Sequence, residues 1–214
     1  MRFTTIAFIG TILSASAFGQ VSGLYNTGVD NSGTVLSNLS TDTHYNFSFA
    51  NGPQTAGIAV TDAEGDPVGV TWLSDDARSD WDTVSDSTSG PAGDYLWTTT
   101  FNISSLASPI NLVGRYSSDD VLEDVLVNGH STGISSTTVG NWPFWFNLDI
   151  LSAKDPFFQT GTNTLQFVVS NSAGPTGLRV EFGVPDSGLN LAWVAAALGG
   201  LCLIGRSARR SVAA

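Results

Sequence analysis

The chain has 214 residues and a formal net charge of −11. Residues 20–183 hold 18 of the 19 acidic residues but only four bases, Arg78, Arg115, Lys154 and Arg179, which leaves 14 net negative charges on this segment. Repulsion of this size excludes nucleic acid and anionic membrane surfaces as partners. The single cysteine is Cys202, so residues 20–183 form no disulfide and must be stabilised by a hydrophobic core.

The N-terminus has the organisation of a secretory signal peptide. Met1 and Arg2 supply a positive start, residues 3–13 are apolar, and Ala15-Ser16-Ala17 is a small-residue cleavage site, with 17–19 as a second choice. The apolar stretch is too short to span a membrane. We therefore expect residues 1–19 to be removed on export.

Residues 20–183 have the length of one ordinary domain, and their pattern favours strands. Alternation of apolar and polar residues recurs, separated by turn residues, and the dipeptide Asn128-Gly129 is typical of a type I′ hairpin. The pattern predicts an all-β domain, an antiparallel β-sandwich or jelly roll. The predicted inward-facing sets are Tyr95, Trp97, Thr99 and Phe101; Val121, Glu123, Val125 and Val127; Trp142, Phe144, Phe146 and Leu148; Leu165, Phe167 and Val169; and Leu178, Val180 and Phe182.

The first part of this domain has weaker signals. Residues 26–38 are rich in turn formers, whereas 45–49 and 57–61 are typical of early strands. Residues 75–93 carry many acidic residues and few apolar ones. We expect this last segment to be a long acidic surface loop.

The last thirty-one residues contain three successive features. They are the turn-forming motif Val184, Pro185, Asp186, Ser187 and Gly188, an apolar run over 189–205, and the bases Arg206, Arg209 and Arg210. As a helix the apolar run would be about 25 Å long, close to the thickness of a bilayer core. The alternative is a buried core helix. We favour a single transmembrane helix, with the arginines in the cytoplasm and residues before 184 on the other side.

These three features resemble the C-terminal sorting signals of the PEP-CTERM class, in the variant named VPDSG-CTERM. The motif at 184–188 matches that variant in order, although the Glu-Pro pair of the commoner form is absent. The resemblance implies recognition and processing by an exosortase-like membrane enzyme. The order of strands and turns from Trp72 to Glu181 resembles the galactose-binding-like jelly-roll domains of exported bacterial proteins, which often hold a structural calcium ion.

The residues offer little for catalysis. His44 and His130 are the only imidazoles in the chain, and neither lies in a Ser or Cys nucleophile motif. Glycoside cleavage needs two carboxylates, for which Asp119-Asp120 and Glu123-Asp124 are candidate pairs, but shaping a turn and lying on a wet sheet face explain them more simply. We expect no catalytic residues and no enzyme activity.

Calcium is a better candidate, because it prefers the oxygen ligands that this domain offers in quantity. The segment 62–66, Asp-Ala-Glu-Gly-Asp, lacks the order of an EF-hand. No motif places a calcium ion. A second acidic cluster, equally explained as a solvated loop, comprises Asp75, Asp76, Asp80, Asp82 and Asp86.

Carbohydrate binding would require an exposed aromatic ring and a few directed polar groups. Trp97 and Trp142 fall in inward-facing sets and are predicted core residues. Trp145 faces away from Phe146, and Trp81 lies between two aspartates, so these two are the candidate stacking residues. We expect a non-enzymatic surface or extracellular-matrix protein, with polysaccharide as a candidate partner. The alternatives are a purely structural surface protein without a small ligand and, less favoured, a glycan-cleaving enzyme.

Overall fold

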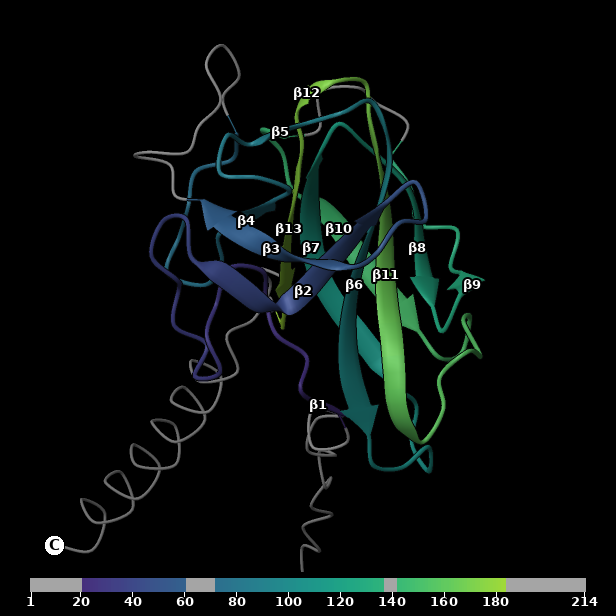
Figure 1. Ribbon diagram of the computed structural model, residues 1–214. Helices are drawn as coiled ribbons and strands as arrows, with labels where there is room; N and C mark the ends of the chain where they lie inside the picture. Colours follow the sequence, from purple (N-terminus) through teal and green to yellow (C-terminus); the bar gives the residue numbers. More distant parts are fainter. Residues whose placement is uncertain (1–20, 61–71, 137–141, 184–214) are drawn as a thin grey trace, which may run out of the picture. The chain divides into compact units, whose positions relative to one another are not determined.

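The computed structural model describes residues 21–60, 72–136 and 142–183, which form strands, turns and loops and no α-helix (Figure 1). Within these ranges, therefore, no helix is long and apolar enough to cross a membrane. The predicted signal peptide, the acidic segment 62–66 and the predicted sorting tail 184–214 lie outside the described residues.

Eleven strands form one antiparallel sheet, in the order β10-β7-β13-β4-β3-β2-β6-β11-β8-β9, with β1 also paired to β6. Two further short strands, β5 and β12, pair with each other. The strands are β1 Val21–Ser22, β2 Thr41–Phe49, β3 Thr55–Val60, β4 Trp81–Thr83, β5 Ser89–Gly90, β6 Gly93–Ile103, β7 Asn111–Asp119, β8 Val121–Val127, β9 His130–Ser131, β10 Phe146–Leu151, β11 Gly161–Asn171, β12 Gly174–Pro175 and β13 Gly177–Phe182.

The large sheet curls into two layers around one core. Figure 1 shows β2, β6, β11 and β8 in front of β13, β7 and β10, while β3 and β4 continue the sheet from β2 to β13. The main core contains buried side chains from both layers, such as Trp97 and Phe167 from one and Tyr116 and Val180 from the other. The prediction of an all-β antiparallel domain is therefore confirmed.

Simple alternation correctly predicted the two central strands of the front layer. Trp97 of β6 pairs with Phe167 of β11, and both side chains are fully buried. The predicted hairpin is also confirmed, since Asn128 and Gly129 both have positive φ, 50° and 80°, and Val127 pairs with His130.

The predicted inward face of β8 is wrong at its start. The pairing with β11 shifts by one residue: Val168 is opposite Asp124, but Val169 is opposite Leu122. A bulge of this kind moves each preceding side chain to the other face. Leu122 is consequently buried and Glu123 is exposed.

The prediction for Phe144 is also wrong. β10 begins only at Phe146, so the alternation that places Leu148 and Ile150 in the core does not extend back to Phe144. The Phe144 side chain is 61% exposed, and Trp142 packs partly buried against a second, smaller core cluster formed by Val60, Trp72 and Trp81.

The expectation of an acidic surface loop over 75–93 is wrong in its central part. Residues from Ser79 to Thr83 are buried, and Trp81–Thr83 forms β4 between β3 and β13. Two carboxylates, Asp80 and Asp82, are therefore inside the domain. Asp86, further along the same segment, is exposed as expected.

Candidate functional site

A polar groove of about 310 Å³ lies on the front layer, over the middle of β6. Its walls come from the segment after β1, from β2 and from Gln54 of the β2–β3 loop. The lining residues are Gly23, Tyr25, Thr43, His44, Asn46, Gln54, Thr98, Thr99, Thr100 and Asn102.

The groove exists because two strands meet β6 at different points. β1 pairs with β6 at Asn102 and Ile103, whereas β2 pairs with it only from Thr98 toward Tyr95. The residues between these two pairings, Thr99 to Phe101, face the gap where the neighbouring strands diverge. β2 itself shifts register against β3 between Asp42 and Asn46, at the groove wall.

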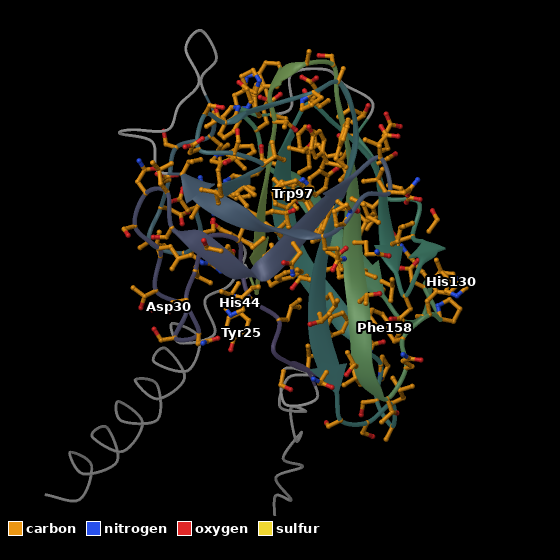
Figure 2. All side chains as sticks on the ribbon, in the orientation of Figure 1. Tyr25, Asp30, His44, Trp97, His130 and Phe158 are labelled. Atoms are coloured by element: carbon orange, nitrogen blue, oxygen red, sulfur yellow. The ribbon has the colours of Figure 1, made fainter. Side chains whose placement is uncertain are left out.

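One wall of the groove is a stacked pair of rings. The rings of Tyr25 and His44 are parallel to within 18°, with centroids 3.8 Å apart (Figure 2). The His44 ring lies behind the Tyr25 ring as seen from the groove: the His44 side chain is only 10% exposed, whereas Tyr25 is half-buried. The Tyr25 backbone is anchored from below, since its carbonyl oxygen accepts a hydrogen bond from the hydroxyl of the buried Tyr45 at 2.9 Å.

The His44 ring is held on both of its nitrogens. Nδ1 lies 3.0 Å from the carbonyl oxygen of Val29, and Nε2 lies 3.0 Å from Oδ1 of Asn31. Both contacts fix the ring plane on which Tyr25 rests.

Asn31 is itself positioned by a tight turn. Asp30 accepts hydrogen bonds from the amides of Ser32 and Thr34 at 2.8 and 2.9 Å, and from the Ser32 hydroxyl at 2.7 Å. These bonds, with the Ser32 hydroxyl as the largest contribution, hold the pKa of Asp30 below its usual value. The stacked wall is thus built in advance of any ligand.

Polar side chains form the floor and the opposite wall. Thr43, Gln54, Thr100 and Asn102 are exposed, and Asn46 is half-buried. Hydroxyl and amide groups both donate and accept hydrogen bonds. An aromatic ring beside such groups can contact the C–H face of a sugar while the polar groups bind its hydroxyls.

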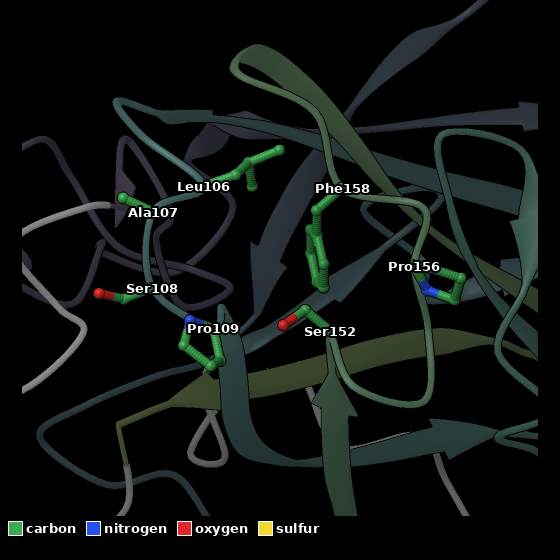
Figure 3. Close-up of a pocket in the computed structure, with 7 residues that line it drawn as sticks. All are labelled: Leu106, Ala107, Ser108, Pro109, Ser152, Pro156 and Phe158. Atoms are coloured by element: carbon green, nitrogen blue, oxygen red, sulfur yellow. The ribbon is translucent and has the colours of Figure 1, made fainter.

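A second hollow, of about 360 Å³, lies between the β6–β7 and β10–β11 loops (Figure 3). It is mostly apolar and is lined by Leu106, Ala107, Ser108, Pro109, Ser152, Pro156 and Phe158. The Ser152 hydroxyl already accepts a hydrogen bond from the amide of Ile110 at 3.0 Å. This hollow offers apolar contact with few directed polar groups, so it suits a hydroxyl-rich ligand less well than the groove.

The two tryptophans predicted as stacking residues lie elsewhere. Trp81 is 1% exposed and packs against Trp72 with ring centroids 4.4 Å apart, so the expectation of an exposed Trp81 ring is wrong. Its aspartate neighbours are buried with it. Trp145 is half-buried on the back layer, where the guanidinium carbons of Arg115 and Arg179 lie 4.1 and 5.0 Å from its ring centroid. The Trp145 ring therefore already makes cation–π contacts with two arginines of the domain.

The candidate acid pairs have separate structural partners. Asp119 is buried and accepts a hydrogen bond from the Trp72 indole at 2.7 Å; burial raises the pKa of Asp119 to about 8. Asp120 accepts bonds from the amide and hydroxyl of Ser172 at 2.7 and 2.6 Å. Glu123 is exposed at the bulge of β8. Asp124 accepts a hydrogen bond from the Ser131 hydroxyl at 3.0 Å. These contacts explain Asp119, Asp120 and Asp124 as parts of the fold.

Residues at and just before the start of the acidic segment surround a positively charged side chain of the same domain, Arg179. Arg179 is fully buried, and Nη1 donates to the carbonyl oxygens of Leu73 and Ser74 at 3.0 and 2.6 Å. Nη2 donates to the carbonyl oxygen of Ser79 at 3.1 Å, and Nε donates to the Ser79 hydroxyl at 2.8 Å. Glu181 lies 3.7 Å away.

Carbonyl and carboxylate oxygens are also the ligands that a calcium ion prefers, but the oxygens described above already surround Arg179. Across the described residues, no group of three or more His, Cys, Asp or Glu side chains has the geometry to hold a metal ion. Structural calcium therefore stays a prediction without a position.

Sequence reasoning missed the groove. The predicted inward set of β6 leaves Thr98 and Thr100 on its outward face, but the gap beside them depends on where β1 and β2 pair. The signal present in the sequence was the pair Asp42 and His44 after a turn-rich segment. Tyr25, the half-buried ring of the site, lies just before the turn-rich residues 26–38, with no periodic pattern around it.

No protein-family model matches the chain, and no curated protein matches it. Solved structures that align with it include a family 35 carbohydrate-binding module from Clostridium thermocellum, with 15% identity over 59% of this chain and 95% of that chain and a TM-score of 0.33. Another is the CBM35 from Paenibacillus barcinonensis, with 16% identity over 68% of this chain and 99% of that chain and a TM-score of 0.34. At identities and TM-scores this low, the likeness assigns no ligand to the chain.

Proposed function

We propose that this domain binds carbohydrate in the groove over β6, as a non-catalytic module of the cell surface or extracellular matrix. The observation that carries the proposal is the stacked Tyr25–His44 wall beside exposed hydroxyl and amide side chains. A sugar ring has apolar C–H faces and a polar rim. The groove offers a partner for each within one space of sugar size.

The expected main contact is with the Tyr25 ring. Replacing Tyr25 by alanine should weaken polysaccharide binding by about 1–3 kcal/mol, roughly 5- to 150-fold in Kd, because the stacking area is lost. The fold should persist, since the Tyr25 backbone oxygen rather than its side chain bonds to Tyr45. An array of matrix polysaccharides, followed by titration calorimetry on those that bind, measures the effect.

Two further variants locate the platform. Tyr25→Phe keeps the ring and should bind like the parent protein. Trp145→Ala tests the platform predicted from the sequence, and a loss of binding in that variant alone would move the site to the back layer. If the parent protein binds no polysaccharide, the protein is a structural surface component; if it cleaves labelled glycans, it is an enzyme.

The proposed route to the surface is the sorting tail. Residues 1–19 would direct export, residues 184–214 would hold the protein in the inner membrane, and an exosortase-like enzyme would process the tail near 184–188. The expected mature protein lacks the signal peptide, cut after Ala17 or Gly19, and lacks Arg206, Arg209 and Arg210. Intact-mass measurement of surface-extracted protein checks this, and a mature chain that retains residues 206–214 would mean a permanent anchor instead.

A further inference from the structure

The groove has an electrostatic character that restricts its ligands. Its ten lining residues include no Lys, Arg, Asp or Glu, and both nitrogens of its one imidazole, His44, already lie 3.0 Å from oxygens of Val29 and Asn31. The charged side chains next to its stacked wall are both acidic. Asp42 Oδ1 lies 3.5 Å from His44 Nδ1, and the charge of Asp30 interacts with His44.

The basic side chains of the domain lie away from the groove. Arg78, Arg115 and Arg179 all surround Glu181 of β13, in the back layer, at 3.9, 2.7 and 3.7 Å. Lys154, the fourth base, lies in the loop after β10. The groove therefore has no guanidinium or ammonium group in its lining to receive a carboxylate or a sulfate.

Building on the proposed carbohydrate site, we propose that the groove selects neutral and amino-bearing glycans and rejects uronate-containing and sulfated ones. Recognition of a sugar carboxylate or sulfate normally uses charge-assisted hydrogen bonds, most often from arginine. Hydroxyl and amide groups recognise neutral hydroxyls equally well without such a partner. The field of a domain with 14 excess negative charges repels polyanions and attracts protonated amines.

The test compares glycans that share a backbone and differ in charge. The pairs are polygalacturonate with its fully methyl-esterified form, β-1,4-glucuronan oligosaccharides with cello-oligosaccharides, and chitosan with chitin oligosaccharides, at a mildly acidic pH and low salt. Within each of the first two pairs, where binding occurs, the anionic form is expected to bind about tenfold or more weakly than the neutral form. Added salt should weaken the binding of chitosan and leave that of neutral glycans nearly unchanged.

A single added cation should relax the selection. Thr100 is exposed on the groove floor, so Thr100→Lys should give a measurable gain in binding of the anionic glycan. Asn147→Lys makes the same change in net charge at an exposed position of β10 in the back layer and should give no such gain.

Two results would overturn this inference in distinguishable ways. Equal binding of polygalacturonate and its methyl ester at low salt would contradict the charge selection while the carbohydrate site stands. If no member of any pair and no polysaccharide of the array binds, the proposed function fails and the selection fails with it.

Discussion

Replacing Arg179 with methionine is expected to cost about 3–5 kcal/mol of unfolding free energy, the range for removing one partner of a buried ionic network. The guanidinium is fully buried and donates to the carbonyl oxygens of Leu73, Ser74 and Ser79. Its loss would remove a donor from each of these oxygens, of which that of Leu73 keeps the Trp81 indole at 2.9 Å, and would leave the fully buried Glu181 with less compensating charge. Urea unfolding followed by tryptophan fluorescence measures the change.

Arg78 supplies the matched control. It lies 3.9 Å from the same Glu181, but its side chain is 41% exposed, so Arg78→Met should cost about 1 kcal/mol or less. Arg179→Lys should fall between the two variants, because an ammonium group keeps the charge but cannot reach three carbonyl oxygens at once. Equal losses for Arg78→Met and Arg179→Met would contradict the central role of Arg179.

In β13 of the back layer, alternation correctly predicts the side chains that face the core but not the burial of the charged side chains between them. Leu178 and Val180 point into the main core as predicted. Arg179 and Glu181, between and after them, should then face water, yet both are fully buried. What covers them is the segment after Trp72, far away in the chain, and no local pattern reveals that a distant acidic segment will lie over a particular strand.

The front layer shows a different limit. The inward faces of β6 and β11 follow from period-two alternation, because both strands are long and regularly paired. The face of β8 could not be predicted at its start, because one bulge opposite Val168 and Val169 reverses the alternation. A bulge is a property of the pairing of two strands, and neither strand alone contains it.

The groove depends on the same kind of non-local information. Tyr25 becomes a platform only because His44 lies against it, and His44 is fixed by Val29 and Asn31 across a turn. All four residues lie within a short stretch of the sequence. Whether the two rings stack depends, however, on the path that the backbone takes through the turn, which no local pattern predicts. Alternation and acidic neighbours pointed instead to Trp145 and Trp81, which the fold uses mainly for packing.

The unfolding free energy of this protein is expected to fall as the pH rises from about 5 to about 9. Burial, followed by the influence of Asp75, raises the pKa of Asp80 to about 9, and burial raises that of Asp119 to about 8. Burial, followed by the charge of Asp42, raises the pKa of Asp82 well above its usual value.

The sign follows from proton counting. An aspartate in the unfolded chain loses its proton near pH 3.8, whereas these three keep theirs in the folded protein until the pH approaches their raised pKa values. Between these limits the folded state binds more protons, so each rise in pH favours the unfolded state. The stabilising contribution is complete below about pH 4, declines steadily above it, and is fully lost once the pH has passed about 8–9.

Asp82 gives the sharpest variant. It is fully buried, and among the described residues neither of its carboxylate oxygens has a hydrogen-bond partner. Asp82→Asn keeps the shape, removes the ionisable group and places an amide donor near Asp42. It should raise the unfolding free energy at mildly alkaline pH by about 1–3 kcal/mol, the cost of an unsatisfied buried polar group, and should flatten the pH dependence.

Asp86→Asn makes the same chemical change at an exposed position of the same segment and should alter neither stability nor its pH profile by more than about 0.5 kcal/mol. Urea unfolding of the parent and both variants across the pH range separates burial from the general effect of removing one negative charge. A parent profile that is flat over this range, or an Asp82→Asn variant less stable than the parent at alkaline pH, would show that Asp82 is ionised and compensated in the folded protein.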